Sequence, residues 1–258
     1  MYVKLKKALF GTLQAAILFW KDLTQTLTCW GFEVNPYDWC VANKTIEGKQ
    51  CTILWHVDDI NISHVNKDDV SSVIDYLSNR YGKEAPLTVT RGKIHRYLGM
   101  TFDYSTVGKV QIKMSDYIKG ILESLPPSMD GESATPAANH LFTINKHAKI
   151  LETPEAEMFH HYVAKLLFLC KQARPDIQTA IAFLSTRVKA PDQDDSKKLR
   201  RVMRYLRATQ ELPLTLESDD SLQPSWWVDT SFATHHDMKS HTGGLMKLRK
   251  GAVYATSR

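Results

Sequence analysis

The sequence predicts an α+β protein. Some segments repeat apolar residues at the spacing of an α-helix, whereas others alternate apolar and polar residues or run continuously apolar, as β-strands do. The chain has 258 residues, of which 43% are hydrophobic and 24% are charged. This length and composition are typical of a globular protein with a sizeable core, arranged in one large or two modest domains.

The first third of the chain predicts two helices and a group of strands. Helices are expected over residues 12–31 and 67–82, and each ends at a glycine. Strand patterns lie between them, over residues 32–42, 51–57 and 60–65. The last two strands flank Asp58 and Asp59. We therefore expect a β-hairpin with these two acids at its turn.

The rest of the chain predicts strands, then helices, then strands again. Residues 95–115 have the pattern of two strands joined by a turn near Gly108. Four helices are expected to follow, the second with Thr153 as its N-cap, over residues 115–125, 153–172, 175–187 and 194–209. Strand-like patterns complete the chain, over residues 212–219, 224–234, 242–251 and 252–258. We expect four tryptophans in the core rather than as base-stacking platforms, namely Trp20, Trp55, Trp226 and Trp227.

The composition excludes several classes of protein. The net charge of +5 permits an anionic partner but does not require one. The four cysteines lack the spacing of a disulfide framework or a zinc site, which favours an intracellular location. The sequence has neither a signal peptide nor a run of about 18 apolar residues, so we expect no membrane association. No targeting signal decides between cytoplasm and nucleus.

The paired acids predict a cation site or a solvated turn. If Asp58 and Asp59 are the two turn residues, His56 faces Asn61 across the hairpin. His56 and His64 then lie roughly 10 Å apart along the strands at ~3.3 Å per residue, which disfavours a shared metal. Carboxylates without histidine or cysteine suit Mg²⁺ rather than zinc, and two such ions are the usual device for displacement at phosphate. The alternative is an ordinary turn with two solvated acids.

The predicted helix over residues 194–209 has one apolar face, and the remainder is strongly basic. Its arginines are Arg200, Arg201, Arg204 and Arg207. They could follow a nucleic-acid backbone, because each phosphate contact adds salt-dependent affinity. They could equally form a solvated face opposite the apolar one.

A series of blocks follows in an order and spacing that covers essentially the whole chain. Residues 9–15 read LFGTLQA, residues 31–32 read GF and residues 56–59 read HVDD. Further blocks are RYLGMTFDY, MSDYIKGIL, SATPAANH, HYVAKLLFLCKQARPDIQTAIAFLS, RRVMRYLRAT and WWVDTSFATHHDMKSHTGG. Together they resemble the copia-type LTR retrotransposon reverse transcriptase, whose corresponding first blocks are Leu-Tyr-Gly-Leu-Lys-Gln-Ala, Gly-Phe and Tyr-Val-Asp-Asp. A lone Val-Asp-Asp would be a weak signal, whereas the ordered set is specific.

The resemblance implies a domain organisation. A partial palm and thumb would occupy residues 1–125, followed by a linker over residues 126–153, which are rich in Pro, Ser, Ala, Asn and His. A helical connection would span residues 154–212, and a truncated RNase H-like segment residues 213–258. The implied activity is that of an RNA-directed DNA polymerase, with an RNA or DNA template-primer and deoxynucleoside triphosphates as partners.

The same resemblance implies roles for particular residues. Asp58 would be the principal ligand and Asp59 the supporting ligand of Mg²⁺ or Mn²⁺. Gln14 corresponds to a glutamine near the incoming nucleotide and template, although it could also be a plain helix-surface amide. Asp229 stands where an RNase H domain has its first metal-binding aspartate, and could otherwise be an ordinary strand-end acid.

The sequence departs from the family pattern around the implied active site. The third catalytic aspartate of the family has no matching position, the motif tyrosine is His56, and two bases are replaced by Leu13 and Ile17. Losing one member of a concerted catalytic set can lower the catalytic rate by several orders of magnitude. We therefore expect the chain to be inactive alone. Three possibilities stay open: a polymerase that needs an upstream segment from a longer precursor or partner, a non-catalytic nucleic-acid-binding remnant, and a degraded gene without a stable product.

Overall fold

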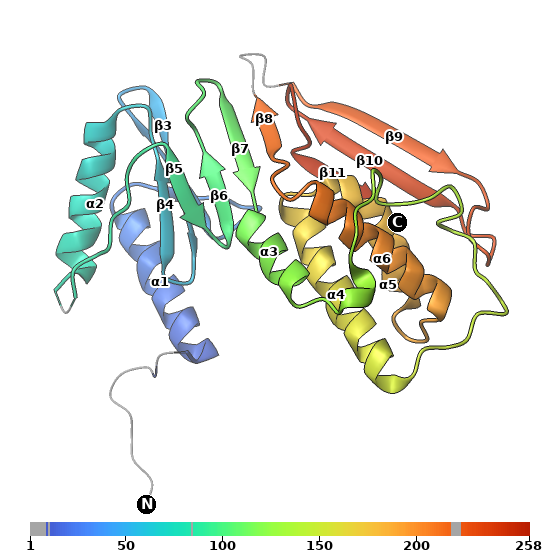
Figure 1. The fold of residues 1–258 in the computed structure, drawn as a ribbon. Coiled ribbons are helices and arrows are strands. Elements are labelled where there is room, and N and C mark those ends of the chain that lie inside the picture. The colour runs from blue at the N-terminus through green and yellow to red at the C-terminus, as the bar shows by residue number, and fades with distance from the viewer. Residues whose placement is uncertain (1–8, 10, 84, 218–222) are drawn as a thin grey trace, which may run out of the picture. The chain divides into compact units, whose positions relative to one another are not determined.

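The protein has a mixed α/β fold. The computed structural model describes residues 9, 11–83, 85–217 and 223–258, which form six α-helices, two 3-10 helices and three antiparallel sheets (Figure 1). The chain divides into two compact units, residues 1–90 and 91–258. This division falls well before residue 125, where the first predicted domain ends.

The first unit is a four-stranded antiparallel sheet with two helices. Its strands lie in the order β1–β2–β3–β4, as they follow along the chain. The elements are α1 (Leu13–Cys29), β1 (Glu33–Val34), β2 (Val41–Ile46), β3 (Lys49–His56), β4 (Asp59–Ser63) and α2 (Lys67–Tyr81). Both helices begin at a side-chain cap, because Thr12 accepts from the Ala15 amide and Asn66 accepts from the Asp68 amide.

One face of this sheet forms the core of the first unit with the two helices. Along β3, every second residue is buried: Cys51, Ile53 and Trp55. These side chains share a cluster with apolar residues of both helices, among them Leu23, Leu27, Val73 and Leu77. The alternation expected of a strand with one buried face is confirmed for β3.

The second unit contains two further sheets and four helices. One sheet has the order β5–β6–β7–β8 and the other β11–β10–β9. The strands are β5 (Ile94–Tyr97), β6 (Met100–Asp103), β7 (Lys109–Lys113), β8 (Leu214–Glu217), β9 (Ser225–Ser231), β10 (His241–Lys247) and β11 (Tyr254–Ser257). The helices are α3 (Ser115–Glu123), α4 (Thr153–Gln172), α5 (Gln178–Arg187) and α6 (Gln193–Ala208), with 3-10 turns η1 (Pro127–Met129) and η2 (Pro175–Ile177).

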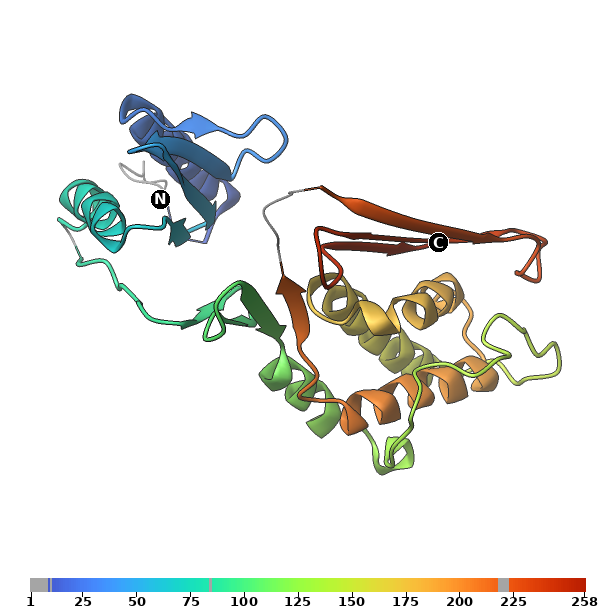
Figure 2. The ribbon, with the colours of Figure 1, turned by 90° about the horizontal axis from the view of Figure 1, so that it is seen from above.

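The core of the second unit lies among α3, α4, α5 and α6. It also includes Met100 and Ile112 from the β5–β8 sheet, and Met129 and Leu141 from the expected linker. Figure 2 shows the β9–β11 sheet as a separate layer over the helices, where β11 contacts α5. Residues 91–125 therefore share their core with the helices that follow them.

Several predicted elements differ from the observed ones. Residues 95–115 hold parts of three strands rather than two, because Leu98 and Gly99, both with positive φ, form a tight turn between β5 and β6. The N-cap of α4 is Glu152, so Thr153 is already helical. The strands expected over residues 213–258 belong to two sheets, since β8 pairs with β7 whereas β9, β10 and β11 form a sheet of their own.

Candidate functional site

The β3–β4 hairpin carries the paired acids, in a register that differs from the predicted one. His56 faces Asp59 and Trp55 faces Ile60, so the turn consists of Val57 and Asp58. The prediction that His56 faces Asn61 was wrong, because its partner lies two residues earlier on β4 and the turn lies one residue earlier. The observed register places Trp55 and Ile60 together on the face packed against the helices, which a slip by one residue would prevent.

In this register the two acids occupy different positions in the hairpin. Asp58 lies at the turn, whereas Asp59 is the first residue of β4 and shares the face of His56. Because successive side chains alternate between faces, His56 and Asp59 lie on the face opposite the buried Trp55. Both acids are exposed. Val57 has a φ of 55°, a conformation that costs a β-branched residue free energy.

The hairpin offers the right kind of ligand for Mg²⁺ but too few. Among the residues that the structure describes, no three His, Cys, Asp or Glu side chains gather as candidate metal ligands. Asp22 and Asp38 of the same unit have other partners, since Asp22 binds Arg80 at 2.8 Å and Asp38 accepts from the Cys40 amide at 2.9 Å. The described residues therefore do not complete a two-metal centre at this hairpin.

Gln14 is the second residue of α1, and its side chain is exposed. Leu13 and Ile17, which stand in place of two family bases, are also exposed. An exposed position at the start of α1 suits a glutamine that contacts a nucleotide or template, and equally suits a plain helix-surface amide. Its contact with a nucleotide or template stays a prediction.

Three of the four arginines of α6 bind the segment that precedes α4. Arg201 donates to the hydroxyl of Thr135 at 2.8 Å, and Arg204 donates to the carbonyl of Asp130 at 2.6 Å. Arg207 forms an ion pair of 3.0 Å with the Asp130 carboxylate. These bonds tie residues 130–135 to the helix, which a purely solvated face would not do. Contact of α6 with a nucleic acid stays a prediction.

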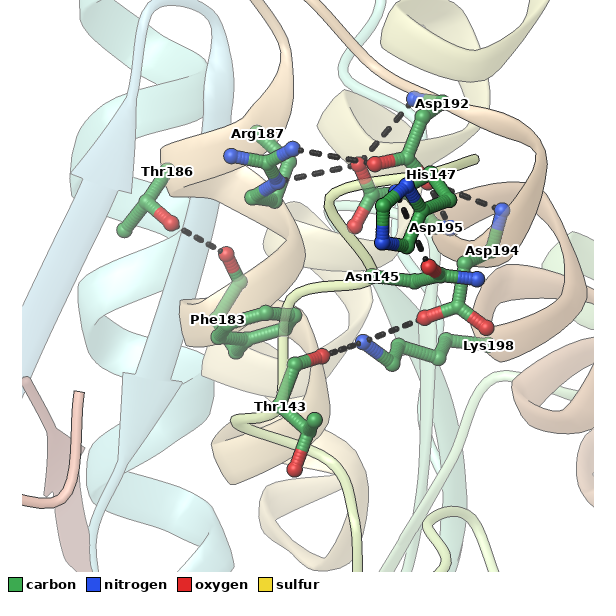
Figure 3. Close-up of polar contacts among 10 residues, drawn as sticks. All are labelled: Thr143, Asn145, His147, Phe183, Thr186, Arg187, Asp192, Asp194, Asp195 and Lys198. Atoms are coloured by element: carbon green, nitrogen blue, oxygen red, sulfur yellow. Dashed lines mark hydrogen bonds and ion pairs between the residues drawn. The ribbon is translucent and has the colours of Figure 1, made fainter. Parts of the chain in front are cut away.

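A polar cluster at the start of α6 was not anticipated from the sequence. Asp192 and Asp195 form a capping box, and both accept from Arg187, at 3.3 and 2.9 Å (Figure 3). Burial raises the pKa of Asp195, which is 1% exposed, while its hydrogen bonds oppose that rise. Lys198 is also buried, and its ammonium binds Asp194 at 3.0 Å (Figure 3). The spacing of Asp192 and Asp195 before an amphipathic helix was the signal that could have revealed the cap.

Arg174 is the largest fully buried side chain of the chain's described part, at 2% exposure. Its guanidinium donates to the Asp176 carboxylate at 2.8 Å, and to the carbonyl and hydroxyl of Thr209 at 2.9 and 2.7 Å. Tyr205 donates to Asp176 at 2.9 Å. The sequence block around Arg174 thus joins η2 to the end of α6, a structural role that the motif alone did not reveal.

Asp229 lies on β9, opposite Gly243, and is exposed. It lines an open cavity of about 700 Å³, which Asp176 also lines. As at the hairpin, the described residues gather no third metal ligand here. The expectation that Trp226 and Trp227 are core residues was wrong, because they are 56% and 47% exposed on the same strand.

Among the residues that the structure describes, no helix combines the length and apolar character needed to cross a membrane.

Comparisons with known proteins point to mobile elements. A putative transposon Ty5-1 protein of Saccharomyces cerevisiae is 26% identical over 247 residues, which cover 95% of this chain and 77% of the yeast protein. The retrovirus-related Pol polyprotein from transposon TNT 1-94 of Nicotiana tabacum is 25% identical over 98% of this chain. The retrovirus-related Pol polyprotein from transposon RE1 of Arabidopsis thaliana is 26% identical over 94% of this chain. The chain spans 19% and 16% of the length of these two plant polyproteins.

No family model matches the chain. No solved structure matches it either. The similarity therefore rests on whole-chain alignments with transposon proteins. Along nearly its entire length, the chain is similar to retrotransposon Pol polyproteins, at 24–26% identity.

Proposed function

We propose that this chain is the part of a retrotransposon Pol polyprotein that carries the metal-binding hairpin of a reverse transcriptase. The observation that carries the proposal is the tight β3–β4 turn, which presents Asp58 and Asp59 at one end of an antiparallel sheet. The first unit would then be part of a palm. The second unit would contain thumb, connection and the first strands of an RNase H domain.

In this proposal, Asp58 and Asp59 supply two carboxylates to Mg²⁺ or Mn²⁺, and Gln14 lies near the template and the incoming deoxynucleoside triphosphate. The described residues bring no third acid to the hairpin. The third carboxylate would therefore come from another segment of a longer polyprotein or from a partner chain. The chain alone would not extend a primer on an RNA or DNA template.

A chimera tests this proposal. The chain replaces the aligned segment of the tobacco transposon polyprotein, and primer extension is measured with Mg²⁺ and with Mn²⁺. We expect extension by the chimera and none by the isolated chain. Asp58→Asn should lower the chimera's rate by several orders of magnitude, because it removes a member of a concerted set.

Asp38→Asn is the matched control for that substitution. Asp38 is another exposed acid of the first unit, with a local contact to the Cys40 amide. Its replacement should leave extension nearly unchanged. Extension that survives Asp58→Asn, or a chimera that is inactive beside an active parent polyprotein, would contradict the proposal.

Nucleic-acid binding without catalysis is a second candidate function. It is favoured by α6, in which six Lys and Arg residues lie within the 16 residues of one helix. The test is binding of single-stranded and duplex oligonucleotides at increasing salt. Affinity should fall steeply with salt, because each cation that neutralises a phosphate releases counterions. Binding that is absent, or independent of salt, would rule out this candidate.

A further inference from the structure

A cationic cleft lies between α6 and the segment before α4. Its volume is about 380 Å³, far above the roughly 10–15 Å³ that one water molecule requires. Five cationic side chains line it against two carboxylates, Glu132 and Asp194. The cations are Lys197, Lys198, Arg200, Arg201 and Arg204. This excess gives the cleft a positive potential, which favours an anion.

Three of the five cations already have partners within the protein. Lys198 binds Asp194, Arg201 binds Thr135, and Arg204 binds the carbonyl of Asp130. These bonds fix the walls of the cleft. They also leave fewer donors for a ligand than the sequence suggests.

Arg200 differs from these three. Its Nε is buried and, among the described residues, has no hydrogen-bond partner. An unpaired buried donor on a charged group is costly, and commonly marks the place of an ion or water. Arg207 also has an unpaired buried Nε, but its guanidinium is ion-paired with Asp130 and does not line the cleft. Lys197 lines the cleft, is exposed, and has no ion pair within the described part of the chain.

We propose that this cleft binds a phosphate group, with Arg200 and Lys197 as its principal contacts. The planar fork of Arg200 suits two phosphate oxygens, and Lys197 adds a second positive charge without an internal ion pair among the described residues. The inference deepens the nucleic-acid-binding candidate and rests on it only for the source of the phosphate. That source is either a nucleic-acid backbone or a free phosphate compound.

The test titrates inorganic phosphate into the full chain by calorimetry, and measures displacement of a fluorescent single-stranded oligonucleotide by phosphate. We expect saturable phosphate binding, weakened about tenfold by Arg200→Gln and by Lys197→Gln, since each removes one charge-assisted contact. Arg200→Lys keeps the charge but not the fork, and should give an intermediate loss. Thermal melts of each variant establish that the fold is retained.

Lys189→Gln is the matched control. Lys189 is exposed just before α6, outside the cleft, and its replacement removes the same charge. No saturable phosphate binding, or an equal loss in Lys189→Gln and Arg200→Gln, would overturn the proposal. If phosphate displaces the oligonucleotide, and Arg200→Gln weakens the binding of phosphate as well as that of the oligonucleotide, the ligand is a nucleic-acid backbone. If only phosphate binding depends on Arg200, the site takes a free phosphate compound, and nucleic-acid binding at this cleft is excluded.

Discussion

Asp59 lies directly opposite His56 across the β3–β4 hairpin. This pairing leaves Val57 and Asp58 as the turn and puts Asp59 at the beginning of a strand. The two acids therefore leave the backbone in different directions, one at the tip and one on the uncovered face of the sheet. A hairpin with both acids in the turn would instead pair His56 with Asn61 and Trp55 with Ile62, which leaves the same face of β4 buried.

Relief of backbone strain at the turn gives the first prediction. Val57→Gly should raise the free energy of unfolding by about 0.5 kcal/mol or more, because glycine adopts the φ of 55° without a steric penalty. Val65→Gly is the control, since Val65 is 79% exposed and is not among the residues with positive φ. Urea unfolding followed by tryptophan fluorescence measures both. An equal destabilisation by the two substitutions would contradict strain at Val57.

Removal of the buried guanidinium gives the second prediction. Arg174→Met should lower the free energy of unfolding by about 3–5 kcal/mol, because Asp176 loses its partner in a mostly buried site. Arg174→Lys should also destabilise, since one ammonium cannot reach both Asp176 and Thr209. The control is Arg80→Met, which removes an exposed pair with Asp22 and should cost far less, because solvent screens that pair. Similar costs at the two arginines, measured by urea unfolding, would exclude a special role for Arg174.

Loss of the α6 cap gives the third prediction. Asp192→Ala should destabilise by about 1–2 kcal/mol, because the Asp194 and Asp195 amides lose their acceptor and Arg187 loses one partner. Gln193→Ala changes the neighbouring first helical residue, which is exposed, and should be nearly neutral. Thermal unfolding of both variants provides the measurement. A neutral Asp192→Ala would mean that the capping box does not stabilise α6.

Acid sensitivity gives the fourth prediction, from His241. Burial and, secondly, nearby His235 lower the pKa of His241 below its ordinary value of 6.5. A histidine with a depressed folded pKa contributes stability that is present above pH 6.5 and is lost as the pH falls through the folded pKa. As the pH falls from about 7 to about 5, the free energy of unfolding should therefore decrease more for the wild type than for His241→Gln.

His147→Gln is the control for this pH effect. His147 is exposed, and its replacement should leave the acid-side loss of stability in place. Urea unfolding at several pH values compares the three proteins. An unchanged difference between wild type and His241→Gln across that range would show that His241 does not titrate with unfolding.

Most local elements of this protein can be predicted from patterns of neighbouring residues. Helical spacing and glycine stops located α1 and α2, and the alternation around Asp58 and Asp59 predicted their hairpin. These features depend on neighbours within a few residues, so the sequence records them directly. The capping signal at Asp192 and Asp195 was equally local and could have been recognised.

Which of these elements contact one another depends on long-range packing and became known from the structure. The residue that faces His56 across the hairpin was established by the observed strand pairing, and the pairing of β8 with β7 joins segments that are distant in the sequence. The expected linker has no periodicity, yet Arg201 and Arg204 tie it to α6 and thereby form the cleft beside Arg200. Such contacts depend on long-range packing and on the partners of individual charges. A charge pattern along one helix therefore cannot distinguish an arginine that binds other residues of the protein from one that is available to a ligand.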